Sequence, residues 1–101
     1  LVEDQEVRAR EQTAEDLAKE NIRETRAAEL LEQEKDHLDE LLELLEQKLA
    51  RQMEQTPNVR TLSRLKAVRD ARAQKRKNVN SGLLTEVLAD RLVKGKTIWQ
   101  R

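Results

Sequence analysis

The sequence predicts an all-α fold in which a long N-terminal helix, paired as a coiled coil, is followed by a helical hairpin that completes a three-helix bundle. Charged residues make up 40% of the chain, apolar residues 37%, and Trp99 is the only aromatic residue. Glycine and proline, which interrupt helices, occur three times in total. Leucine recurs at helical spacing. Together these features are typical of long helices and coiled coils.

The first helix is predicted to run over residues 1–55, which contain neither glycine nor proline. At about 1.5 Å per residue it would be on the order of 80 Å long. A heptad repeat that places Val7 at position a gives a seam that is weak before Ala28 and strong from there to Leu49. We therefore expect residues 1–35 to protrude as a coiled-coil stalk. Its interaction seam comprises Val7, Ala14, Leu17, Asn21, Ala28 and Leu31. Asn21 is either a device that fixes the register or a tolerated polar residue.

The bundle is predicted over residues 36–95, with helices at about 36–55, 57–77 and 83–94 and a tail at 96–101. Thr56 and Pro57 have the form of an N-cap and a first helical residue. Residues 78–82 form a turn by composition, and Gly95 is placed to end the last helix. The expected core consists of Leu38, Leu42, Leu45, Leu49, Leu62, Leu65, Val68, Leu84 and Leu88.

Charge divides the chain into two complementary halves. Residues 1–55 hold 17 acidic and 8 basic residues, a net charge of −9, and residues 56–101 hold 3 and 12, a net charge of +9. The predicted acidic face comprises Glu32, Asp36, Asp39, Glu40, Glu43 and Glu46. The predicted basic face comprises Arg64, Arg69, Arg72, Lys75 and Arg76. The two faces either pair with each other within the fold or assembly, or the basic one contacts nucleic acid.

No motif in the sequence supports catalysis, a metal site or a cofactor site. The pair Glu34 and His37 has the spacing of a di-iron ligand pair, but His37 is the only histidine. The segment 95–97 resembles the end of a phosphate-binding loop, yet Asp90 stands where that loop needs a glycine. Cysteine is absent, which excludes disulfides and thiolate metal ligands. We expect a chain without catalytic, metal-binding or cofactor-binding residues.

The sequence has neither a transmembrane segment nor a signal segment, so a soluble protein is expected in a compartment that the residues leave open. The chain begins at Leu1 rather than at methionine, which suggests a fragment or a processed form. The function predicted is a non-enzymatic coiled-coil adaptor or scaffold that binds a protein partner or a second copy of itself. The alternative is a nucleic-acid-binding accessory protein that uses the basic helix at 60–77. Trp99 either docks on its own bundle or anchors an interface.

Overall fold

The computed structural model describes residues 2–19, 21–77 and 80–94 of the chain, and within them every regular element is helical. The order is α1 (Val2–Ala18), α2 (Glu24–Gln33), a 3-10 turn η1 (Lys35–His37), α3 (Leu38–Gln55), α4 (Val59–Arg76) and α5 (Ser81–Lys94). This confirms the predicted all-α class. Trp99, Gly95 and the predicted tail lie outside the described residues.

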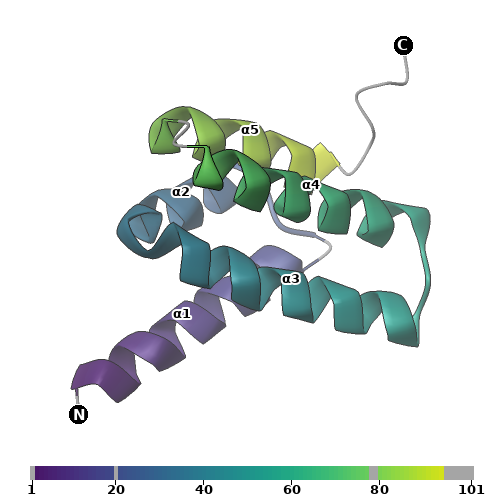
Figure 1. The fold of residues 1–101 in the computed structure, drawn as a ribbon. Helices are drawn as coiled ribbons and strands as arrows, with labels where there is room; N and C mark the ends of the chain where they lie inside the picture. Colours follow the sequence, from purple (N-terminus) through teal and green to yellow (C-terminus); the bar gives the residue numbers. More distant parts are fainter. Residues whose placement is uncertain (1, 20, 78–79, 95–101) are drawn as a thin grey trace.

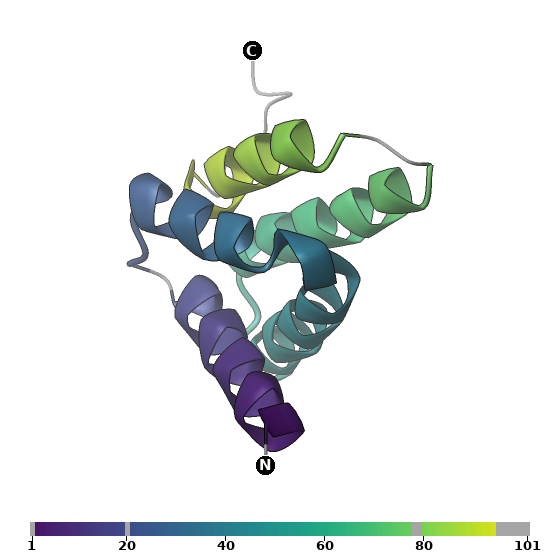
Figure 2. The same cartoon turned by 90° about the vertical axis from the view of Figure 1, so that its left-hand side faces the viewer.

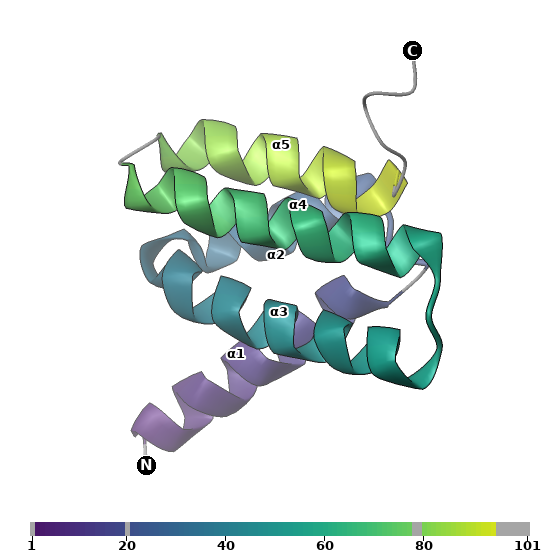
Figure 3. The same cartoon turned by 45° about the vertical axis from the view of Figure 1, so that its right-hand side comes forward.

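The helices stack in tiers around α3 (Figure 1). α1 and α4 both pack on α3, and α4 packs in turn on α5. α2 packs against α5, so helices from the first and last parts of the chain are in contact (Figure 2). α4 and α5 run side by side as an outer pair, with α1 at the opposite side of the molecule (Figure 3). The radius of gyration is 12.9 Å. A chain of this length that included a helix of about 80 Å would be far more extended.

The arrangement therefore differs from a stalk joined to a three-helix bundle. Residues 1–55 do not form one helix, because the chain leaves helical geometry after Ala18 and again at Glu34. Asn21, expected at an a position of the seam, is instead exposed in the connection between α1 and α2. Asparagine favours turns because its side chain competes for backbone hydrogen bonds. The break lets the thin apolar stripe of α1 pack on α3, so residues 1–35 do not protrude.

One continuous core fills the space between the helices. Ala14, Leu17 and Leu31 of the predicted interaction seam are completely buried in it, while Ala28 is half-buried and Val7 is 50% exposed. Of the nine leucine and valine residues expected in the core, eight are buried there. Leu62 is the exception, at 38% exposed. It lies off the stripe of Thr61, Leu65 and Val68 that α4 buries, so its side chain reaches the surface.

Each of the last two helices begins after an asparagine. For α4 the capping residue is Asn58 and not the predicted Thr56. The side-chain Oδ1 of Asn58 accepts a hydrogen bond from the Thr61 backbone N–H at 3.1 Å. The Oδ1 of Asn80 accepts one from the Leu83 N–H, also at 3.1 Å. Each asparagine satisfies a donor that the first helical turn leaves without a partner. α4 therefore begins two residues later than predicted, and α5 begins two residues earlier.

The burial of α1 leads to a prediction about stability. Leu17→Ala and Leu45→Ala should lower the free energy of unfolding by similar amounts, about 2–5 kcal/mol each, because both side chains are fully buried. Urea unfolding followed by circular dichroism measures this. Val7→Ala is the matched control on the exposed side of α1, and it should change stability by no more than about 0.5 kcal/mol. A large loss at Leu45 with almost none at Leu17 would contradict the packing of α1 on α3.

Candidate interaction surface

The basic helix α4 uses its cations in three different ways. Arg64, predicted as part of the basic face, is 0% exposed. Its guanidinium donates hydrogen bonds to the backbone carbonyls of Ala18 at 3.0 Å and Lys19 at 3.2 Å, and to that of Leu17. The carbonyls of Leu17 and Ala18 belong to the last turn of α1, where a helix leaves its final acceptors without helical donors, and Lys19 follows directly. A cation at this end is also favoured by the helix dipole. Arg64 is thus a structural residue that holds the C-terminus of α1.

Arg69 and Arg72 of α4 converge on one carboxylate of α3. The Nε of Arg69 donates to Glu46 at 2.9 Å, and Arg72 donates to the other carboxylate oxygen. Partial burial alone would raise the pKa of Glu46, but the hydrogen bonds and positive charges of the two arginines outweigh it. The pKa of Glu46 therefore lies below its ordinary value. Pairing between the two predicted faces is present in the structure at this point.

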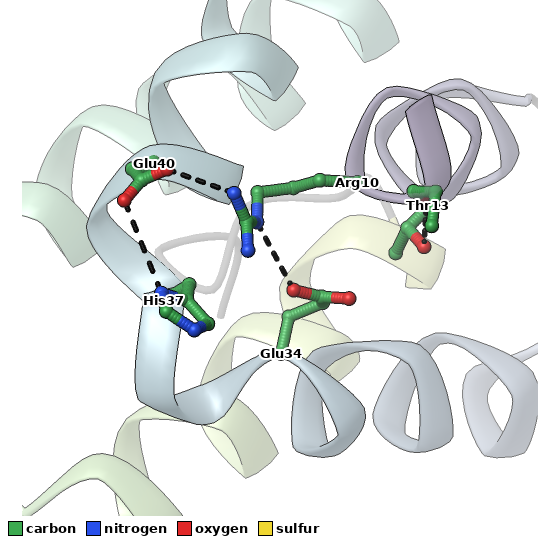
Figure 4. A network of polar contacts seen from close by, with 6 residues as sticks. Arg10, Thr13, Glu34, His37 and Glu40 are labelled. Atoms are coloured by element: carbon green, nitrogen blue, oxygen red, sulfur yellow. Dashed lines mark hydrogen bonds and ion pairs between the residues drawn. The ribbon is translucent and has the colours of Figure 1, made fainter. Parts of the chain in front are cut away.

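The remaining members of the acidic face are distributed over other contacts or exposed. Glu40 accepts from the buried Arg10 of α1 at 2.8 Å, and Glu34 accepts from the same guanidinium at 3.2 Å (Figure 4). Arg10 falls at a d position in the weak early part of the heptad seam, where an apolar residue is expected. Glu32 pairs with Lys35, and Asp36, Asp39 and Glu43 are exposed. Because α3 and α4 are antiparallel, the acidic first turns of α3 lie beside the basic last turns of α4.

The third use of the basic residues is at the C-terminal end of α4. Lys75 is half-buried, and Arg76 and Lys77 are exposed. None of the three side chains makes a hydrogen bond or ion pair within the described part of the chain. Arg76 also lines a shallow notch of about 240 Å³ together with Arg69, Arg72 and Glu46. This end of α4 is the most basic exposed region that the structure describes.

A wider groove of about 500 Å³ lies between α4 and α5. Leu84 and Leu88 of α5 and Ala67 and Ala71 of α4 form its buried floor. Its rim carries Leu83 and Val87, which are 56% and 49% exposed. At one end, Arg91 of α5 donates to Asp70 of α4 at 3.1 Å across the groove. Lys77 lies at the other end. The sequence does not predict this groove, because its width depends on how closely α4 and α5 pack.

Exposed apolar side chains are concentrated on the same helix pair. Of the five large apolar residues exposed in the described part of the chain, only Val7 lies elsewhere. The other four are Val59 and Leu62 of α4 and Leu83 and Val87 of α5. The α4–α5 pair, with its groove and the basic end of α4, is therefore the candidate interaction surface. The α4–α5 surface comprises the groove, its rim and residues 75–77.

The single histidine of the chain lies away from the α4–α5 groove. His37 lies 3.9 Å from Glu40 on the molecular surface (Figure 4). Among residues whose placement is described, no three histidine, cysteine or acidic side chains come together as a metal would require. The helices searched there also include none with the length and hydropathy to cross a bilayer.

The shared carboxylate of Glu46 leads to a second prediction. A lowered pKa in the folded state stabilises the fold at pH values above about 4.5, and this contribution is lost as the pH falls through the folded-state pKa. Glu46→Gln should therefore lower the free energy of unfolding by about 1 kcal/mol at neutral pH and by progressively less in acid. Urea unfolding between about pH 3 and pH 7 measures the difference. Glu43→Gln, on the exposed face of the same helix, is the matched control for the loss of one negative charge. A Glu46→Gln loss that stays constant with pH would contradict the assignment.

Comparison of the chain with protein-family models, with curated proteins and with solved structures found no match. The functional inference therefore depends on the surfaces of this chain alone.

Proposed function

We propose that this chain is a non-enzymatic helical adaptor or scaffold module that binds another protein through the α4–α5 surface. The observation that carries the proposal is the clustering of Leu83 and Val87 on the rim of the groove between these helices. Exposed apolar side chains next to a concave surface typically mark an interaction site. When a partner covers such a side chain, the removal of its apolar surface from water favours binding by about 25 cal/mol per Å².

This proposal moves the interaction site away from the predicted seam in residues 1–35. Pairing of two chains through Ala14, Leu17 and Leu31 would require these side chains to leave the core in which they are buried. Only Val7 of that seam presents substantial apolar surface. Coiled-coil pairing through α1 would therefore have to overcome the packing of α1 on α3. The α4–α5 surface needs no such rearrangement.

Nucleic-acid binding is the second candidate, and one observation favours it. Lys75, Arg76 and Lys77 have no bound carboxylate among the described residues, so their charges could neutralise phosphates. Two other features weigh against it. The guanidinium of Arg64 is hydrogen-bonded to the carbonyls at the end of α1, and those of Arg69 and Arg72 are hydrogen-bonded to Glu46. The acidic turns of α3 beside α4 would also repel a phosphate backbone. We therefore rank it below protein binding.

The third prediction tests where the partner binds. A photo-crosslinking amino acid placed at Val87 should give a covalent protein adduct in the native host, and the same label at Glu11, exposed on α1, should not. The Val87 adduct should disappear when Leu83→Glu is added, because a carboxylate on the rim makes burial of that surface costly. Circular dichroism verifies that the Leu83→Glu chain remains folded, as its 56% exposure implies. Mass spectrometry then identifies the crosslinked protein.

Two outcomes would contradict the proposal. Equal crosslinking from Val87 and Glu11 would mean that the α4–α5 surface is not a preferred site. Submicromolar binding of a DNA or RNA duplex near 0.15 M salt, with a log-log salt slope steeper than about −4, would favour the nucleic-acid candidate instead. Duplex binding no tighter than about 10 μM would only reflect a basic surface.

A further inference from the structure

We infer that the groove between α4 and α5 accepts a single amphipathic helix that carries leucine-like anchors on one side and acidic residues on its flank. This inference rests on the proposed function, because it names the chemistry of the partner segment that would occupy the α4–α5 surface. Three properties of the groove favour this occupant: its shape, its apolar lining and its charge.

The shape favours a helix as the occupant. The groove follows two antiparallel helices and is lined on the α4 side from Ala67 to Lys77, a rise of about 15 Å. A segment of about ten helical residues, or three turns, has this length. Ala73, which is exposed on the α4 side of the groove, presents only a methyl group, so a side chain of an incoming helix can approach the α4 backbone closely there. A volume of about 500 Å³ accommodates a few large side chains.

The lining sets the spacing of the anchors. Leu83 and Val87 are one helical turn apart on α5, and both are about half exposed at the rim. Leu84 and Leu88, one residue further along, are buried beneath them. An occupant helix with apolar residues at positions i, i+3 or i+4, and i+7 would place successive anchors along this row. Such anchors would cover the apolar surface that the chain itself leaves in contact with water.

The charge of the rim selects an acidic flank. Asp70, the only acidic residue that lines the groove, is already paired with Arg91 at 3.1 Å. Lys77 at the opposite end has no ion-pair partner within the described residues, and Gln74 between them is neutral. The exposed Arg76 adds positive charge next to Lys77. A carboxylate of the bound helix near Lys77 would be attracted to these two cations, and a cation at the same place would be repelled by them.

The experiment uses the full chain and two synthetic helical peptides. Both have leucine at i, i+4 and i+7, and they differ only in flanking glutamate or flanking lysine. Titration followed by amide NMR should give a dissociation constant on the order of 10 μM for the glutamate peptide, with shifts concentrated at Ala73, Leu83 and Val87. The lysine peptide should bind at least tenfold more weakly. Val87→Glu should reduce the affinity for the glutamate peptide at least tenfold.

Two further variants separate apolar from electrostatic recognition. Lys77→Glu should reduce or reverse the preference between the two peptides without changing the fold, since the Lys77 side chain makes no described polar contact and glutamate keeps the backbone hydrogen bond to Gln74. Val59→Glu is the matched control, because Val59 is 79% exposed on α4 but does not line the groove. It should leave both affinities unchanged.

Several results would overturn the inference. These are equal affinity for the two peptides, shifts centred on α1 or α3, or no binding at millimolar peptide. A chain that dimerises alone, with the peptide competing for Val87, would identify the occupant as a second copy. If a crosslink at Val87 captures a protein but the glutamate peptide shows no preference, this inference fails while the proposed function stands. If Val87 captures no protein, the proposed function fails whatever the peptides do.

Discussion

The end of α1 is held by the buried guanidinium of Arg64, and the course of the rest of the chain depends on this contact. Arg64 donates to the carbonyls of Leu17, Ala18 and Lys19, and the side-chain Nε2 of Gln52 donates to Ala18 at 3.1 Å. Taking a guanidinium out of water costs several kcal/mol unless its donors find acceptors. The end of a helix provides such acceptors, and the helix dipole adds favourable interaction. Arg64 and α1 therefore stabilise each other, and the chain reverses direction directly after this contact.

The reversal determines which surfaces remain available for binding. It places α1 on α3 and α2 on α5, so the acidic first half of the chain encloses the leucine core instead of extending away from it. Arg10 is drawn into the same packing and is neutralised by Glu34 and Glu40 (Figure 4). With these faces used, the outer side of α4 and α5 retains most of the exposed apolar residues that the structure describes. The proposed binding role of that surface follows from what the folded chain leaves uncovered.

The sequence predicts the helical class and most of the core, because leucine periodicity and the scarcity of glycine and proline are local properties. It does not predict the break after Ala18, since residues 19–23 contain neither glycine nor proline, and Asn21 could equally be a tolerated polar residue of a weak seam. The break coincides with tertiary contacts that the sequence does not reveal, chiefly those of Arg64 with the carbonyls of residues 17–19. One signal was present in the sequence: Arg64 falls on the same helical stripe as Thr61, Leu65 and Val68, where a basic residue should be solvated or paired. The groove between α4 and α5 could not be predicted, because it depends on how closely these two helices pack.

The most direct test of this account is hydrogen exchange of the α1 amides in Arg64→Met, a substitution that keeps an unbranched apolar stem and removes the donors. Hydrogen bonds from a charged donor contribute about 1.5–3 kcal/mol, so α1 amides should exchange roughly 10- to 100-fold faster in the variant. Amides in the centre of α3 should lose much less protection. Equal loss in every helix would mean that Arg64 stabilises the fold without specifically anchoring α1. Unchanged protection of α1, or an unprotected α1 in the parent chain, would contradict the account.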